Sequence, residues 1–310
     1  MRDYTIPIYL FTGLLESGKT SFIKKKMKDP HFNSGEKTMI IVCETGIEEF
    51  SSDDDSLRNS VVIYIDNEDY VSKEYFERLN DDSIERVLIE YNGLWQLEEL
   101  YNSFPNNWLI FQQLMFVDAS TFNSYNKMFR NQIAKMLKNC EMCIFNRLND
   151  ENEKEDLHKN ARMFSLKSDI YYEYIDHKIE KDDKKAVLPF DLTSDIITIK
   201  LRDYAIWYLD ITSDFDKYNG REIQIEGQIR IDVNTSSVIF GRKVMVCCEA
   251  DIKFLGMKLI YETNISFEVN KWYKIKGIIE KSEGEIPIKL HVDKLEMIDK
   301  PNINEEIATF

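Results

Sequence analysis

The chain has 310 residues, enough for two domains, and its 43% hydrophobic and 12% aromatic residues exclude wholesale disorder. Its formal net charge of −15 argues against a nucleic-acid backbone or an anionic membrane surface as the main partner. Five cysteines without the spacing of a disulfide framework favour reduced thiols and a cytoplasmic location. We find neither a secretory segment nor the roughly 18 consecutive apolar residues that span a bilayer, so we expect no direct membrane insertion.

The first predicted elements are an apolar strand at 6–11 and a basic helix at 21–28, joined by a turn that reads G-x-x-x-x-G-K-T. This is the phosphate-binding loop pattern, found here in the strand–turn–helix context that it needs. Backbone N–H groups and the helix N-terminus would bind phosphate, Lys19 would reach the β- and γ-phosphates, and Thr20 would bind Mg²⁺. The loop therefore predicts a nucleotide site built from Gly13, Ser17, Gly18, Lys19, Thr20 and Ser21.

Strand and helix patterns alternate as far as residue 175. Further strands are predicted at 38–42, 61–65, 86–89, 112–117, 142–145 and 169–175, and further helices at 71–79, 97–102, 121–139 and 151–164. The alternation predicts an α/β P-loop domain over 1–175 with a doubly wound, mostly parallel sheet. Ligands bind beyond the carboxyl ends of strands in such sheets, and the phosphate loop follows the first strand.

The pattern then changes. A charge run at 176–185 predicts a solvated linker, which we extend over 176–195. Strands are predicted beyond it at 196–201, 207–211, 222–231, 238–246, 258–265, 272–279 and 286–298. Residues 196–310 are therefore expected to form a small all-β, OB-like domain.

Two loops are expected to close over the phosphates. Glu90 ends the predicted strand at 86–89 and could hold Mg²⁺ directly or through water, although an acidic residue at a strand end is also common. Gly93 could present its N–H group to the γ-phosphate. Glu44, after the strand at 38–42, could contact metal or the attacking water, or could simply cap a turn. The candidate catalytic residues are thus Lys19, Glu90 and Glu44, and the candidate Mg²⁺ ligands are Thr20 and Glu90.

A base-binding loop is expected after the strand at 142–145, where residues 146–149 read N-R-L-N, similar to N-K-x-D. Asn146 could bridge the base and the phosphate loop, and the stem of Arg147 could pack on a purine. Asn149 stands where an aspartate would accept two hydrogen bonds from guanine. An amide has one accepting oxygen, so guanine selectivity should weaken by about 1–3 kcal/mol. Asp150 could substitute only if the loop shifts.

Together these segments resemble the CobW family of P-loop GTPases, relatives of the nickel chaperones for hydrogenase and urease. The family's opening I-P-V-T-V-L-T-G-F-L-G-A-G-K-T-T is similar to residues 6–21, and its I-V-N-E-F-G, I-E-T-S-G-L and V-V-D-A-x-x-F motifs are similar to 41–46, 89–94 and 116–122. The resemblance implies GTP and Mg²⁺ as ligands, slow hydrolysis, and a partner in metal homeostasis or transport.

Three departures from that family leave alternatives open. Its C-x-C-C metal motif is absent from 63–69, Glu16 puts a negative charge on the phosphate loop, and Asn149 alters the base site. The second hypothesis is therefore a degenerate P-loop scaffold that acts as a non-catalytic interaction subunit of a permease system. A metallochaperone is the third hypothesis.

The second half resembles the YcgQ-like family, which is linked to a predicted permease. The resemblance rests on residues 218–227, 247–251 and 272–277, which are similar to the family's Y-x-G-x-x-V-x-x-G, C-C-x-A-D and W-x-x-x-G. It implies a membrane permease or a metalloprotein as partner. Cys247 and Cys248 are candidate transition-metal ligands with Asp251 and His291. Because neighbouring strand residues point to opposite faces, two buried hydrophobic side chains are the alternative.

Overall fold

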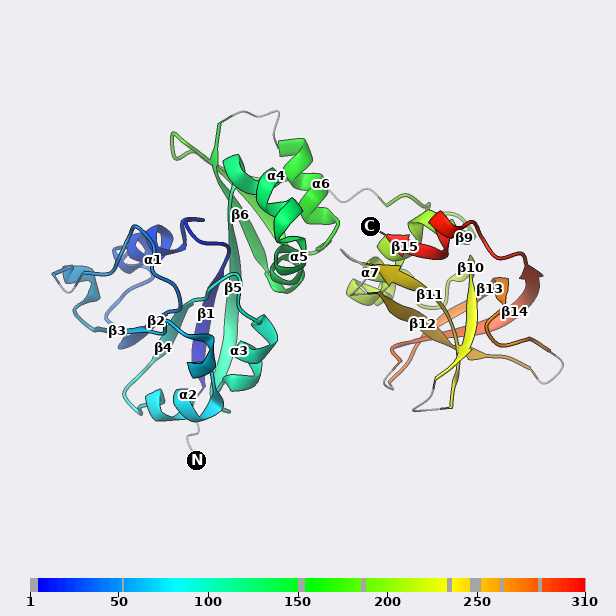
Figure 1. Ribbon diagram of the computed structural model, residues 1–310, viewed down its shortest axis with the longest axis horizontal. Helices are drawn as coiled ribbons and strands as arrows, with labels where there is room; N and C mark the ends of the chain where they lie inside the picture. The colour runs from blue at the N-terminus through cyan, green and yellow to red at the C-terminus, as the bar shows by residue number, and fades with distance from the viewer. Residues whose placement is uncertain are drawn as a thin grey trace. The chain divides into compact units, whose positions relative to one another are not determined.

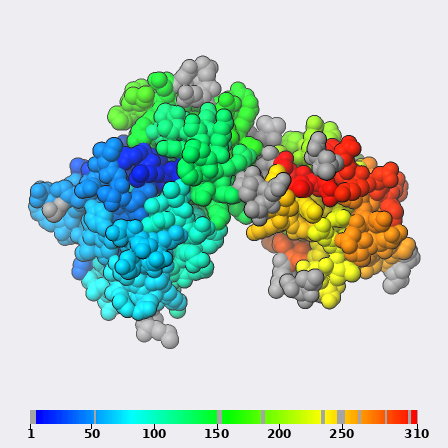
Figure 2. All heavy atoms as spheres, viewed as in Figure 1, coloured from blue at the N-terminus to red at the C-terminus, as the bar shows by residue number. Residues whose placement is uncertain are grey.

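The computed structural model describes residues 5–51, 53–149, 154–184, 188–232, 236–245, 252–262, 265–283 and 286–309. The chain divides into two compact units, Met1–Lys184 and Lys185–Phe310 (Figure 1). Each unit has hydrophobic clusters of its own. Figure 2 shows one face of the chain in space-filling form, coloured along the sequence.

The first unit is built on an eight-stranded sheet with the order β3-β2-β4-β1-β5-β6-β7-β8, in which all pairs are parallel except β7 with β8. Its strands are β1 Ile6–Thr12, β2 Thr38–Val42, β3 Ser60–Tyr64, β4 Arg86–Glu90, β5 Trp108–Asp118, β6 Met142–Leu148, β7 Asp169–Tyr174 and β8 Ile179–Lys181. The prediction of a mostly parallel α/β sheet is confirmed.

Both faces of this sheet are buried, as the nearly continuous apolar strands require. Along β1, Ile6, Ile8 and Leu10 join one cluster, whereas Tyr9 and Phe11 belong to the other. Helix α1 packs on the second face, and α2 and α3 pack on the first. The helices are α1 Lys19–Met27, α2 Lys73–Leu79, α3 Leu97–Ser103, α4 Ala119–Met128, α5 Arg130–Asn139 and α6 Lys154–Arg162, with 3₁₀ turns at Asp55–Leu57 and Glu68–Tyr70.

Two predictions for this unit need correction. The helix expected over 121–139 is two helices, because Phe129 leaves the helical region with φ −121° and ψ 34°. The charge run expected to be a linker contributes β8 to the sheet. Its charged side chains find partners there: Lys181 Nζ lies 2.8 Å from Asp169 Oδ2, and Glu180 Oε2 lies 2.9 Å from Lys154 Nζ.

The second unit is β-rich, as predicted. Its strands are β9 Ile196–Ile199, β10 Glu222–Ile231, β11 Val238–Met245, β12 Lys253–Ile260, β13 Trp272–Lys281, β14 Ile288–Ile298 and β15 Ile307–Thr309. Strand β10 pairs with both β11 and β13, so β10-β11-β12-β14-β13 form a closed ring in which only β12 and β14 are parallel. Short helical segments at Leu201–Asp203, Phe215–Lys217 and α8 Ile303–Glu306 flank the ring strands in the sequence.

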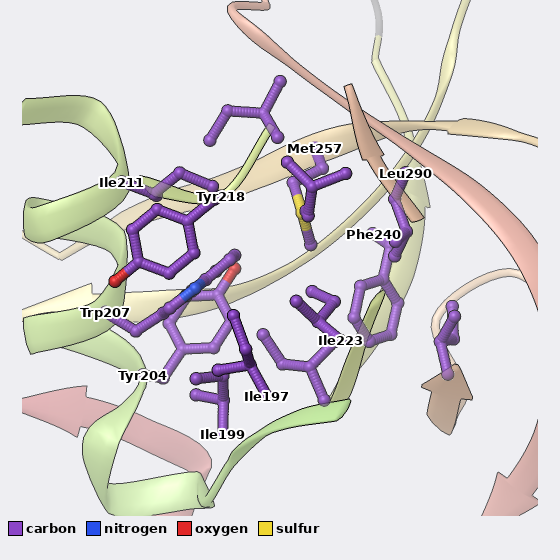
Figure 3. Packing of buried hydrophobic residues seen from close by; sticks show 14 of the residues in the cluster. Ile197, Ile199, Tyr204, Trp207, Ile211, Tyr218, Ile223, Phe240, Met257 and Leu290 are labelled. Atoms are coloured by element: carbon purple, nitrogen blue, oxygen red, sulfur yellow. The ribbon is translucent and has the colours of Figure 1, made fainter. Parts of the chain in front are cut away.

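The strand predicted at 207–211 is wrong, because this segment lies in helix α7, Tyr204–Ser213. Tyr204, Trp207 and Ile211 recur at helical spacing and pack together in the core of the second unit (Figure 3). Asp210, on the same helix, accepts a hydrogen bond from the Tyr218 hydroxyl at 2.6 Å.

In the part of the chain that the structure describes, neither α7 nor another helix has the length and hydropathy of a membrane span.

Candidate functional site

The phosphate loop joins β1 to α1 and has the backbone that its glycines permit. Gly13 (φ +139°) and Gly18 (φ +93°) both lie in the region that L side chains rarely adopt. A Cβ atom on Gly13 would lie 2.6 Å from Ser17 Oγ, and one on Gly18 would lie 2.7 Å from Asn146 Nδ2. The loop is thus closely packed against Asn146, near the end of β6.

Lys19 begins α1 and is buried, with 2% of its surface exposed. Its ammonium donates hydrogen bonds to the Gly13 carbonyl at 2.9 Å and the Leu14 carbonyl at 3.0 Å. It also forms an ion pair with Glu44, which lies just beyond β2. The Lys19 ammonium is therefore held inside the phosphate loop, and the Glu44 carboxylate neutralises its charge.

Thr20 and Glu90 meet on the same side of the loop. Strand β4 is the neighbour of β1, and Phe11 is in register with Glu90, so this carboxylate lies beside the start of the loop. Thr20 Oγ1 donates to Glu90 Oε1 at 2.7 Å, whereas Oε2 is buried and has no partner among the described residues. Burial raises the pKa of Glu90 to about 7, although the Thr20 hydrogen bond and Lys19 act in the opposite direction. Hydroxyl and carboxylate oxygens are the ligands that Mg²⁺ prefers, so the pair fits this ion.

The chain after β4 also packs directly on the loop. A Cβ atom on Gly93 would lie 2.5 Å from the Gly13 carbonyl oxygen and 3.0 Å from the Leu14 nitrogen. Glycine is therefore required for this approach, and the backbone beyond Glu90 lies at the first turn of the phosphate loop.

The end of β6 reaches the other side of the phosphate loop, because the strand predicted to end at residue 145 continues through Leu148. Asn146 Nδ2 donates to the Ser17 carbonyl at 2.6 Å, and its Oδ1 is buried without a partner in the described ranges. Arg147 Nη1 donates to the Glu16 carbonyl at 2.7 Å and forms an ion pair with Asp118 Oδ2 at 2.6 Å. These bonds tie the predicted base site to the phosphate loop.

Two further predicted site residues, Asn149 and Ser21, lie at the surface, whereas a third, Ser17, is buried in the phosphate loop. Asn149 is exposed and directly follows β6. Ser21 is also exposed, and its hydroxyl donates to Glu48 Oε1 at 2.8 Å. Ser17 Oγ, by contrast, is buried and finds no partner in the described part of the chain.

Sequence reasoning gave no role to Asp118, the last residue of β5. It is in register with Asn146 on the adjacent β6, and its carboxylate caps α4 by accepting from Ser120 N at 2.9 Å. Burial acts to raise the pKa of Asp118, but its hydrogen bonds with Ser120 and Arg147 and the charge of Arg147 together lower it. The sequence could have indicated this position. Asp118 ends a strand that is parallel and adjacent to β6, so the two strand ends must lie at the same edge of the sheet.

A cavity of about 550 Å³ opens beside the loop. Leu14 and Leu15 form one wall, Glu44 another, and Leu94 from the chain after β4 a third. Apolar side chains of α4 and the residue that follows it also line the cavity, namely Tyr125, Met128 and Phe129, and residues near the ends of β2 and β3 form its remaining wall. Leu15, Leu94 and Met128 are about half or more exposed, so the mouth of this cavity is apolar.

The predicted transition-metal residues contribute no described site. Cys247, Cys248 and Asp251 lie outside the described residues. His291 interacts with Glu280. Cys43 is buried, and burial raises the pKa of its thiol far above the ordinary value. Among the described residues, no group of three or more His, Cys, Asp or Glu side chains is arranged to hold a metal.

Comparison with known proteins gives one family match and several structural likenesses. Residues 173–304 match the family described as the DUF1980 C-terminal domain. The Zn(II)-bound YjiA GTPase from E. coli is similar at 18% identity over 75% of this chain and 74% of that chain, with a TM-score of 0.41. The hydrogenase maturation factor HypB from Archaeoglobus fulgidus is similar at 13% identity over 56% of this chain and 82% of that chain, with a TM-score of 0.40. No protein with a curated description matches the chain.

Proposed function

We propose that the first unit binds a purine nucleoside triphosphate, GTP, together with Mg²⁺, and hydrolyses it slowly. One observation carries the proposal: three buried polar atoms around the phosphate loop have no partner in the described residues. They are Ser17 Oγ, Glu90 Oε2 and Asn146 Oδ1. An unsatisfied buried polar group costs about 1–3 kcal/mol, so a ligand that satisfies all three at once would be stabilised.

Each residue has a role in this proposal. Lys19 and the loop N–H groups bind the phosphates, Thr20 and Glu90 hold Mg²⁺, Gly93 lies where a γ-phosphate is sensed, and Asn146 links loop and base. Mg²⁺ held by Thr20 and Glu90 would supply positive charge next to the phosphates. Glu44, the remaining candidate catalytic residue, is bound to Lys19, so in this proposal it could contact the attacking water only after its carboxylate leaves that lysine.

Titration of the full chain with GTP, GDP and ATP, with and without Mg²⁺, tests this function directly. We expect saturable, Mg²⁺-dependent binding of GTP by calorimetry, followed by slow release of phosphate. If none of the three nucleotides binds at millimolar concentration, the proposal fails. The alternative of a degenerate P-loop scaffold, a non-catalytic subunit of a permease system, would then be favoured.

The base preference depends on Asn149. Asn149→Asp restores a second hydrogen-bond acceptor, so we expect the ratio of ATP to GTP dissociation constants to rise roughly 5- to 100-fold, the scale of one unpaired donor. Competition titrations measure the ratio. Because Asn149 is exposed, Asn149→Ala should preserve the fold and serves as control. An unchanged ratio in Asn149→Asp would exclude this residue from base recognition.

We further propose that nucleotide state is coupled to a partner in metal homeostasis or transport, either a membrane permease or a metalloprotein, in the cytoplasm. The apolar mouth of the cavity beside the loop supports a protein partner. The second unit is proposed to be an OB-like, YcgQ-like module. Its closed ring of β10-β11-β12-β14-β13, with a single parallel pair, supports the OB-like assignment.

A further inference from the structure

The segment 44–48, which follows β2, is closed down on the phosphate loop by four side-chain contacts. Glu44 pairs with Lys19, and the Ile47 N–H donates to Glu16 Oε1 at 2.8 Å. Glu48 accepts from Ser21 Oγ at 2.8 Å and from Lys24 Nζ at 3.4 Å. The segment is therefore attached to the loop and to the first turns of α1.

The contact of Glu44 with Lys19 occupies the group that a phosphate would need. An ammonium has three N–H donors. The Gly13 carbonyl, the Leu14 carbonyl and the Glu44 carboxylate use all three. Of these partners only Glu44 carries a charge, and it comes from outside the loop. Lys19 can contact a phosphate oxygen only after one of the three bonds is given up.

Glu44 is also the partner with the least favourable surroundings. Its side chain is 7% exposed, and burial raises its pKa against the opposing effect of Lys19. Glu16 and Glu90 lie near enough to add negative potential. A triphosphate that entered without displacing Glu44 would face three carboxylates and one ammonium that is already neutralised. Exchange of the carboxylate for phosphate removes this conflict.

Glu16 gives the segment its second attachment. It has φ +61° within the phosphate loop, so its side chain points toward Gly46. A Cβ atom on Gly46 would lie 2.6 Å from Glu16 Oε1, so residues 46 and 47 fit closely against this carboxylate. Glu16 adds a negative charge to the phosphate loop, and the same carboxylate attaches the segment 44–48 to that loop.

We propose that Glu44 is an internal substitute for phosphate, and that nucleotide binds by exchanging with it and releasing the segment 44–48. This inference rests on the proposed function of the same site and concerns its regulation. In the nucleotide-free protein the carboxylate keeps Lys19 paired. Once phosphate takes its place, the segment loses its buried ion pair with Lys19 and keeps only the exposed contacts of Ile47 and Glu48, so its conformation reports that the site is occupied.

Glu44→Gln tests the exchange, because it removes the competing charge and keeps the side-chain volume. We expect the dissociation constants of Mg²⁺–GTP and of pyrophosphate alone to fall roughly 5- to 100-fold, the range common for coupled binding events. We also expect faster amide hydrogen exchange at residues 44–48 in the nucleotide-free variant. Glu49→Gln is the matched control, since it changes the same charge at an exposed position nearby.

The outcomes separate the exchange from the nucleotide site itself. Binding by Glu44→Gln with little or none by the wild type supports both. Equal or weaker binding by Glu44→Gln, while the wild type binds, overturns the exchange and leaves the proposed function intact. If neither protein binds GTP or pyrophosphate at millimolar levels, both proposals fail. Glu44→Ala, checked by thermal unfolding, repeats the test if the glutamine variant folds poorly.

Discussion

Lys19→Ala is expected to weaken Mg²⁺–GTP binding by at least about 100-fold. Truncating one partner of a buried, hydrogen-bonded charge contact typically costs about 3 kcal/mol or more, and tenfold in affinity corresponds to about 1.4 kcal/mol. The side chain is buried and its ammonium lies at the carbonyls of the phosphate loop, so no other described lysine stands in its position. Isothermal titration of wild type and variant under the same salt and Mg²⁺ concentrations gives the ratio.

The control must separate loss of phosphate binding from loss of charge or of folding. Lys25→Ala removes the same charge from the exposed side of the same helix and should leave the affinity unchanged. Lys19→Ala leaves Glu44 buried without its cation, which is destabilising, so the thermal midpoint should also fall. Adding Glu44→Gln to Lys19→Ala should recover the midpoint but not the affinity. Affinity within a few-fold of the wild type in Lys19→Ala would rule out a phosphate role for this residue.

The sequence predicts the first sheet well because its signals are local and strong. Buried parallel strands are continuous apolar runs, and the G-x-x-x-x-G-K-T pattern marks the turn between the first strand and its helix. Glu90 was expected to end a strand beside β1, and the register of Phe11 with Glu90 places it there. That placement follows from chain order and the geometry of parallel sheets.

Side-chain pairing within the site was not accessible from the pattern. Glu44 and Lys19 are 25 positions apart, and nothing in their local sequence says that the segment after β2 closes on the loop. The role of Glu16 could not be predicted either. Its carboxylate would repel a phosphate if it faced the ligand, but it binds the segment 44–48 instead. Such choices are set by rotamers and tertiary contacts, which periodicity does not encode.

Helix α7 shows the same limit in the second unit. Five of the eight residues at 204–211 are aromatic or β-branched, a composition that favours strands when read in isolation. The fold instead uses Tyr204, Trp207 and Ile211 as one buried helical face (Figure 3). Because most residues of the segment are apolar, the 3.6-residue period is masked, and tertiary packing decides the conformation.

Trp207→Ala is therefore expected to lower the free energy of unfolding of the second unit by about 3–5 kcal/mol, the usual cost of removing a large buried aromatic side chain. Trp207 is 0% exposed, and its ring lies edge-on to that of Tyr204 at 5.4 Å between centroids. Trp207→Phe keeps an aromatic ring and should cost markedly less. Urea unfolding followed by amide hydrogen exchange at each strand measures the change.

The strands whose amides lose hydrogen-exchange protection in Trp207→Ala are as informative as the change in unfolding free energy. Trp207 belongs to the cluster that includes residues of β10 and β13, so the amides of these strands should lose protection. The amides of β1 and β4 belong to the first unit, whose clusters are built from other residues, and should keep theirs. Equal loss in both units would mean that the chain unfolds as one cooperative body. Retained protection in β10 and β13 would show that α7 contributes little to this core, because separate cores predict separate unfolding.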